Sequence, residues 1–426
     1  MTVIDLGELR DEAAPGPSPR RPRSATRLYR CLAVLVVALV TLAGAAPVPG
    51  RTGAIVPGGP GAEAFLVGDR LYVLEVAHPG GGAWRRQLVA YRLTPGHQLP
   101  VLWRTSLPDG GNDVGLLERD GTVLLTGRSA ENTGYETSTV DTRTGRPGWR
   151  QPGVAVVGHD AVLVQSVEDE GMTAIRRVDP STGRTLWSVP IPATGTHLRF
   201  GPEGIDRIVL ARPSGDVEVF DASSGARLIA RNIRPGELPT WQRTQVVDEL
   251  LLVIRDNGGS VTAYGLDGLE LRWTARLSLV GYVEVCGELL CAYRQTGGMW
   301  ALDPATGSTW WTDPRSQSVL RVTGGRFLVD RADATGSRYA VVEAATGRLL
   351  ADLGTWEVAR WADPADPVIG IRRGRDGRLL VAELDVAAGR ARVRDALPDV
   401  LGDCRFGGDV LVCRRIDGRL GLWRLP

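Results

Sequence analysis

The stretch DPSTGRTLWSVPI, residues 179–191, recurs in altered form along most of the 426-residue chain. It places an acidic residue, a glycine and a tryptophan at fixed distances: Asp179, Gly183 and Trp187. An acidic side chain accepts backbone N–H groups inside a turn, and glycine adopts the positive φ that a tight corner needs. The acid and the glycine recur together at Asp141/Gly145, Asp179/Gly183, Asp221/Gly225, Asp303/Gly307, Glu343/Gly347 and Asp385/Gly389. The pattern predicts a repeated corner between two β-strands.

The spacing of these corners indicates the architecture. Successive corners lie about 40 residues apart, and one gap of twice that length contains the degenerate copy YGLDGLELRW, 264–273. Segments such as FLVGDRLYVL, 65–74, are typical of two strands around a glycine turn. Four short strands per repeat predict an all-β fold, a β-propeller of four-stranded blades over residues 62–426.

The number of blades follows from the weaker copies. Counting an irregular corner at 92–103 and an incomplete last unit at 399–426 gives nine units. Because rings of four to eight blades are usual, we expect eight, with one irregular unit folded into a neighbour. The last unit has three strand signals, and we expect GAIV, 53–56, to supply its fourth strand and close the ring.

An apolar segment precedes the repeats. Residues 31–50 carry no charge, and five arginines lie just before them: Arg20, Arg21, Arg23, Arg27 and Arg30. By the positive-inside rule, the N-terminus stays in the cytoplasm and the propeller is exported. We expect a disordered cytoplasmic tail at 1–30, a transmembrane helix at 31–47 and a linker at 48–61. The alternative is a cleaved secretory signal, because Ala43-Gly44-Ala45 resembles a signal-peptidase site.

Four of the five cysteines form two close pairs. In CRFGGDVLVC a two-residue turn at Gly408-Asp409 places Cys404 opposite Cys413, close enough for a disulfide. Cys286 and Cys291 in CGELLC also fit a hairpin, for which we expect a loop longer than two residues. Disulfides in both hairpins agree with an oxidising compartment, and four buried free thiols are the alternative.

Overall charge excludes one class of partner. There are 50 basic and 49 acidic residues, so the formal net charge of +1 gives no field that attracts nucleic acid. Every basic residue is arginine, which we interpret as compositional bias. The four histidines show no zinc-site spacing: His78, His97, His159 and His197.

The motifs VDPSTGRTLWSVPI and ALDPATGSTWWTDP resemble the tryptophan-docking repeats of quinoprotein-type propellers, the pyrroloquinoline-quinone (PQQ)-like group. The group contains PQQ-dependent alcohol dehydrogenases and also non-enzymatic members such as a lipoprotein of the β-barrel assembly machinery. The resemblance implies that the tryptophan of one blade packs on the corner of the next, a role carried over to Trp149, Trp187, Trp311, Trp103 and Trp273. An indole buries about 150–250 Å², so each such contact would stabilise a blade interface.

The resemblance does not extend to the dehydrogenase site. That site uses adjacent cysteines over the quinone, a calcium ion and an aspartate base, and the chain has no Cys-Cys dipeptide. It also has no G-x-S-x-G elbow and no C-x-x-C-H haem site. We therefore expect no enzyme activity, no cofactor and no metal. The residues that line the ring axis are not predictable without the blade register.

These observations favour a single-pass membrane protein with its propeller outside the cell, acting as a binding or scaffolding module. The expected partner is an envelope protein, peptide or glycan. The alternative is an exported quinoprotein-type oxidoreductase with a degenerate cofactor site. A third possibility is a sensor that signals through its arginine-rich tail.

Overall fold

The computed structural model describes most of the chain after residue 52. Its described residues are 53–425 without 60, 78–84, 95–97, 108–114, 130–133, 159–160, 168–172, 193, 203, 235–241, 256–258, 334–335 and 362. Residues 52–426 form one compact unit. The predicted tail at 1–30 and the predicted transmembrane helix at 31–47 lie outside the described residues. Within the described part, no helix is long and apolar enough to cross a membrane.

Every regular element among the described residues is a strand, and the strands form nine sheets, numbered here as blades in chain order. Blade 1 is β2 (Glu63–Val67), β3 (Arg70–Ala77), β4 (Arg85–Arg92) and β5 (Val101–Leu107). Blade 2 is β6 (Gly115–Arg119), β7 (Thr122–Arg128), β8 (Tyr135–Asp141) and β9 (Pro147–Pro152). Blade 3 is β10 (Val154–Val157), β11 (Val162–Val167), β12 (Thr173–Val178) and β13 (Thr185–Ile191).

The next three blades have the same antiparallel order. Blade 4 is β14 (Thr196–Gly201), β15 (Gly204–Ala211), β16 (Asp216–Asp221) and β17 (Arg227–Asn232). Blade 5 is β18 (Arg243–Val247), β19 (Leu250–Arg255), β20 (Ser260–Gly265) and β21 (Leu271–Arg276). Blade 6 is β22 (Val280–Cys286), β23 (Leu289–Arg294), β24 (Met299–Leu302) and β25 (Thr309–Asp313).

The last three blades include the two irregular ones. Blade 7 is β26 (Ser316–Thr323), β27 (Arg326–Asp333), β28 (Gly336–Glu343) and β29 (Leu349–Thr355). Blade 8 is β30 (Glu357–Val358), β32 (Ile369–Arg373), β33 (Leu379–Asp385) and β34 (Arg390–Leu397). Blade 9 has five strands: β31 (Arg360–Trp361), β35 (Val400–Gly407), β36 (Val410–Arg415), β37 (Leu420–Arg424) and β1 (Ile55–Val56).

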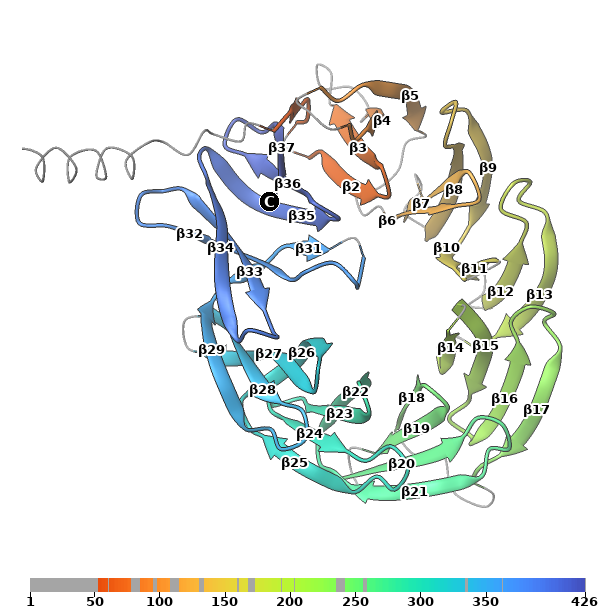
Figure 1. Cartoon of the computed structure of the whole chain (residues 1–426). Helices are drawn as coiled ribbons and strands as arrows, with labels where there is room; N and C mark the ends of the chain where they lie inside the picture. The colour runs from red at the N-terminus through yellow and green to blue at the C-terminus, as the bar shows by residue number, and fades with distance from the viewer. Residues whose placement is uncertain are drawn as a thin grey trace, which may run out of the picture. The chain divides into compact units, whose positions relative to one another are not determined.

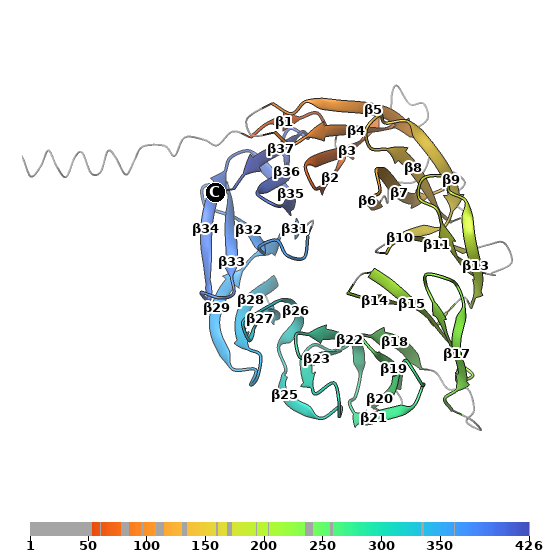
Figure 2. The same cartoon turned by 45° about the vertical axis from the view of Figure 1, so that its right-hand side comes forward.

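The sheets stand side by side around a common centre, with strands such as β2, β6 and β10 innermost and β5, β9 and β13 outermost (Figures 1 and 2). This arrangement is the predicted propeller, but the expectation of eight blades is wrong. The irregular unit is not absorbed by a neighbour, because residues 63–107 complete a four-stranded sheet of their own. Its corner is a longer connection in which the Arg92 N–H donates to the Pro100 carbonyl at 3.0 Å.

The ring is closed by its two ends. β1 pairs with β37, with Ile55 opposite Gly421 and Val56 opposite Leu420. The closing strand expected from residues 53–56 is therefore present, inside the segment predicted as a linker. Val56 is 1% exposed and belongs to the cluster between blades 9 and 1. Closure covers an edge of the last sheet that would otherwise be open to pairing with another chain.

The hydrophobic core lies between the blades. Each of the nine buried clusters in the described residues combines side chains from two neighbouring blades. The cluster between blades 5 and 6, for example, joins Leu252 and Val261 to Val283 and Leu290. A blade buries its faces only against its neighbours, so the stability of the ring depends on each interface.

One connection departs from the regular pattern. β30 starts blade 8, but β31 crosses to blade 9 and pairs in parallel with its inner strand β35 (Figure 1). The register places Arg360 beside Arg405 and Trp361 beside Phe406. The chain then returns to blade 8 through β32. Blade 9 thus receives an extra strand on the side nearest the ring axis.

Candidate functional site

The repeated corners have the geometry that their residue types favour. In the third blade the Asp179 carboxylate accepts the backbone N–H groups of Ser181 and Thr182 at 2.9 and 3.0 Å. The Ser181 hydroxyl also donates to this carboxylate, which lowers the pKa of Asp179 to about 2. Gly183 closes the corner with φ of +71°. Aspartate and glycine therefore hold the shape of the turn.

Each of the five tryptophans singled out in the sequence lies on the corner of the following blade. The indole Nε1 of Trp187 donates to the Ser223 carbonyl at 3.1 Å, and a Cβ on Gly225 would lie 2.8 Å from the ring. The other four Nε1 groups donate to corner carbonyls at 2.7–2.9 Å: Trp103 to Thr142, Trp149 to Pro180, Trp273 to Pro304 and Trp311 to Ala344. The corner glycine thus leaves room for an indole from the neighbouring blade.

A β-bulge aims the indole, and the sequence analysis did not anticipate it. In blade 3, Trp187 pairs with Arg177 and Thr185 pairs with Val178, so Leu186 has no partner across the strand pair. Blades 1, 5 and 6 have the same register shift just before their tryptophans. A bulge bends its strand and redirects the next side chain.

Both predicted cysteine pairs are disulfides. Cys404 and Cys413 have Cα atoms 4.1 Å apart across the Gly408-Asp409 turn that the sequence indicated. Cys286 and Cys291 are joined with Cα atoms 5.9 Å apart. The expectation of a longer loop in the second hairpin is wrong: Cys286 pairs with Leu289, so the turn is the two residues Gly287-Glu288. Gly287 makes this turn possible with φ of +66°.

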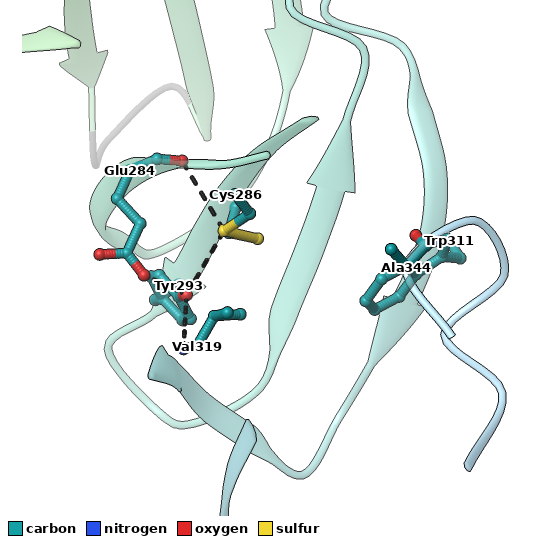
Figure 3. Close-up of a disulfide and its surroundings, with 7 residues drawn as sticks. Glu284, Cys286, Tyr293, Trp311, Val319 and Ala344 are labelled. Carbon is teal, nitrogen blue, oxygen red and sulfur yellow. Dashed lines mark hydrogen bonds between the residues drawn. A yellow bond between two sulfur atoms is a disulfide. The ribbon is translucent and has the colours of Figure 1, made fainter. Parts of the chain in front are cut away.

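The buried side chain of Tyr293, beside the Cys286 disulfide, links blade 6 to blade 7 (Figure 3). Its hydroxyl donates to the Glu284 carboxylate at 2.5 Å and accepts the Val319 N–H of the next blade at 2.9 Å. Burial raises the pKa of both Tyr293 and Glu284. With its hydroxyl bonded on both sides, Tyr293 is a structural connector.

Arginines form a second type of blade contact that was missed in the sequence. Arg373 of blade 8 donates to the carbonyls of Val400 and Leu401 in blade 9, at 3.0 and 2.8 Å. Three more arginines also donate to two carbonyls across an interface: Arg243 to Val280 and Gly281, Arg321 to Pro364 and Asp366, and Arg414 to Gly59 and Ala62. The forked guanidinium suits two acceptors at once. Part of the arginine content is therefore structural.

The axis of the ring carries the arrangement best suited to binding. Arg360 of β31 and Arg405 of β35 are cross-strand partners, and like charges in this position repel each other. The Arg405 guanidinium lies over the Phe65 ring at 4.6 Å and is 3.6 Å from the Glu63 carboxylate. Burial, and then the charge of Arg360, lower the pKa of Arg405. Among the described residues, no carboxylate lies within ion-pair distance of Arg360.

These arginines border two adjoining pockets of about 760 and 610 Å³, lined by residues of blades 1, 2, 3 and 9. Leu117 of β6 lines both pockets with 42% of its surface exposed, and Tyr135, 44% exposed, lines the larger one. Cations beside exposed apolar groups form a surface that holds both charged and apolar parts of a ligand. None of the cysteines and tryptophans singled out in the sequence lines either pocket.

The carboxylates of the smaller pocket already have hydrogen-bond or ion-pair partners within the protein. Glu118 accepts the Tyr72 hydroxyl at 2.8 Å and pairs with Arg70 at 3.1 Å. Asp366 accepts the Gly408 N–H at 3.1 Å, and Asp363 accepts the Ala365 N–H at 2.7 Å. Arg360 is therefore the charged group of this site that is left to pair with a ligand.

The histidines do not form a metal site in the described part of the chain, where no three His, Cys, Asp or Glu residues gather for an ion. His197 lies between blades 4 and 5, with Nε2 2.8 Å from the Thr244 hydroxyl. Burial lowers its pKa to about 4. His78, His97 and His159 are outside the described residues.

Several solved structures are similar to this chain at low identity. BamB from Moraxella catarrhalis is 16% identical with a TM-score of 0.43, and the match covers 85% of this chain and 96% of that one. The computationally designed Ika8 protein is 14% identical with a TM-score of 0.47, covering 72% and 95%. A europium-containing methanol dehydrogenase is 13% identical with a TM-score of 0.43, covering 78% and 83%. Likenesses this distant carry no information about function.

Similarity to a sequence family is more specific than similarity to these solved structures. No curated protein matches the chain significantly. The family model described as outer membrane protein assembly factor BamB matches residues 100–245 and 214–355, which together are more than half of the chain. The chain therefore belongs to the PQQ-like repeat family of the outer membrane protein assembly factor BamB.

Proposed function

We propose that this protein is a protein-binding scaffold whose propeller is held at the outer side of a membrane by residues 31–47. Family membership supports the scaffold role, since the family is described by an assembly factor. The uncharged segment at 31–50 and the arginines before it support the membrane placement. The partner in this proposal is an envelope protein that docks at the ring axis.

The observation that carries the proposal is the pair of like charges at the axis, in which Arg360 has no carboxylate within ion-pair distance among the described residues. Arg360 and Arg405 are neighbours in a strand pair, and the Glu63 carboxylate lies 3.6 Å from the Arg405 guanidinium. A protein fold gains nothing from holding like charges together, so such a pair is typical of a binding surface. The exposed Leu117 next to it supplies apolar contact area.

The described residues do not fit a quinone cage. Both disulfides are buried between blades, with Cys286 1% and Cys404 3% exposed, and neither borders the axial pockets. No adjacent cysteines cover these pockets. The oxidoreductase alternative predicts that PQQ and Ca²⁺ added to the purified protein produce a bound-quinone absorption band and alcohol-dependent dye reduction. The scaffold proposal predicts neither.

Site-specific photocrosslinking in the producing cells tests the docking site. The photoreactive residue p-benzoylphenylalanine replaces Leu117 at the axis in the full-length chain. A matched variant carries it at Leu228 on the outer strand β17, which is 53% exposed. We expect a discrete protein adduct at 117 and none at 228. No adduct at either position, or an adduct at 228 alone, would contradict the proposal.

A chain tagged at both ends tests the membrane placement. We expect the N-terminal tag to remain on the full-size protein in carbonate-washed membranes, and protease added to intact spheroplasts to remove the C-terminal tag. Loss of the N-terminal tag from the mature protein would show a cleaved signal. A protected C-terminal tag would show that the propeller is not exported.

A further inference from the structure

We propose that the arginine pair binds carboxylate side chains of an extended, acidic segment of the partner, with its apolar residues against Leu117 and Tyr135. This inference rests on the proposed scaffold function and names the chemistry that its axial site recognises. It concerns Arg360 and Arg405 above all, because these two side chains bring positive charge to both pockets.

The charge balance of the larger pocket favours an anion. The charged groups that line it are Arg360, Arg405 and Glu63, which leaves one net positive charge. In the smaller pocket, three carboxylates outnumber these two arginines, so the acidic residues of the ligand belong in the larger one. Phe65 covers one face of the Arg405 guanidinium, so the N–H groups at its edge remain the donors for an oxygen ligand. A planar guanidinium pairs with a carboxylate through two parallel hydrogen bonds. A second carboxylate beside Glu63 would relieve the repulsion between the two arginines.

The position of the arginines favours an extended ligand. Arg360 lies on β31, which is the edge strand of its sheet among the described residues. β31 itself shows that the inner edge of a blade accepts an added strand. Among the described residues it pairs with β35 through Arg360 and Trp361 alone, so it covers only part of that edge. An extended segment that follows this edge presents alternate side chains to the same wall. The same wall carries the arginines and Leu117, so alternating acidic and apolar residues match it.

Binding of synthetic peptides to the purified protein tests this chemistry. The probe is a fluorescent peptide of four Asp-Leu repeats, and the neutral comparison is the same peptide with Asn in place of Asp. We expect the acidic peptide to bind at least about tenfold more tightly, and Arg360→Glu to remove at least about tenfold of its affinity. The control Arg390→Glu reverses an exposed charge on the outer strand β34 and should leave binding unchanged.

Salt and small anions distinguish the source of the recognition. Binding of the acidic peptide should weaken as the salt concentration rises, because exposed charge pairs are screened. Inorganic phosphate or PQQ that displaces the peptide at equimolar concentration would overturn the proposal in favour of a small-anion site. Equal binding of the two peptides, no binding of the acidic one, or no effect of Arg360→Glu would also overturn it.

The crosslinking experiment separates this inference from the function on which it rests. In the chain with p-benzoylphenylalanine at 117, Arg360→Glu should reduce the adduct at least about tenfold, and Arg390→Glu should not. An adduct that persists with Arg360→Glu leaves the scaffold role intact and refutes acidic recognition. Unchanged melting temperatures in both variants show that any loss is not a loss of folding.

Discussion

Two neighbouring blade interfaces use different residues for the same contact. Between blades 5 and 6, Trp273 lies on Gly307, where a Cβ would be 2.4 Å from the ring. Between blades 4 and 5, Ile229 occupies the tryptophan position, and the corner glycine is replaced by Leu269. Leu269 is 1% exposed and packs in the same cluster as Ile229. What the interface requires is a filled volume, shared between the two sides.

The replacement has a backbone consequence. Leu269 keeps the corner conformation with φ of +52°, close to the +68° of Gly307. A non-glycine residue is rarely found there, and it costs about 1 kcal/mol or more. Burial of a leucine side chain is worth about 1.5–3 kcal/mol and offsets that cost. The hydrogen bonds of the corner are also kept: the Leu269 N–H donates to the Gly265 carbonyl at 2.9 Å.

Removing an indole should have the largest effect. Trp273→Ala at the blade 5–6 interface, where the indole is 6% exposed, should lower the free energy of unfolding by about 3–5 kcal/mol. Trp187→Ala should cost less, because that indole is only partly buried. Urea unfolding and melting temperatures measure both. An unchanged melting temperature for either variant would count against the docking role of that tryptophan.

Exchange of the residues between the two interfaces should show that they are matched pairs. Ile229→Trp alone should destabilise the protein by up to about 3 kcal/mol, because the indole has no room beside Leu269. Adding Leu269→Gly should recover most of that loss. A double-mutant cycle by urea unfolding measures the coupling; additive effects of the two substitutions would mean that they do not share one space.

The same interface should also respond to pH. His197 is held neutral by burial, with a pKa of about 4, whereas the unfolded chain takes up the proton near pH 6.5. The unfolded state therefore binds more protons as the pH falls from about 6.5 to 4, and stability is lost in that window. At pH 5 this amounts to about 2 kcal/mol relative to pH 7. The charged group that shares a pocket with His197 is Arg243, and this positive charge also opposes protonation of the imidazole. His197→Gln, which keeps a polar partner for Thr244, should show a smaller loss of stability between pH 7 and 5.

The arginine contacts should give the smallest change. Arg373→Lys keeps the charge but cannot donate to Gly377, Val400 and Leu401 with the same fork. We expect a loss of about 1 kcal/mol, the net value of a hydrogen bond in a protein. Arg390→Lys on the outer strand is the control. Equal unfolding midpoints for the two variants would show that the carbonyl contacts do not stabilise the interface.

The predictable part of the molecule is the part that repeats. Asp179, Gly183 and Trp187 appear in copies, so their spacing alone indicates the strands, the corners and the ring. The sequence contains nine units, and the expectation of eight blades was wrong because it followed the usual size of such rings instead of this count. Cys404 and Cys413 were predictable because a turn fixes their distance.

The axial site was not predictable, and the reason is geometric. Arg360 and Arg405 are 45 positions apart, and each is one of 50 arginines. They meet because β31 leaves blade 8 for two residues and returns, a detour with no signal in the repeat. The register of a two-residue strand depends on packing against blade 9. In the sequence, residues 357–368 differ from the other repeats only in that they do not match the repeat pattern.

The pairing of β1 with β37 has a consequence for biosynthesis. Ile55 leaves the ribosome near the start of the ring, while its partner Gly421 belongs to the last blade. The first strand therefore has no partner until β37 of the last blade has been synthesised. A message cut short before codon 420 would yield eight complete sheets and a ninth without β37 and β1, which leaves an open seam in the ring.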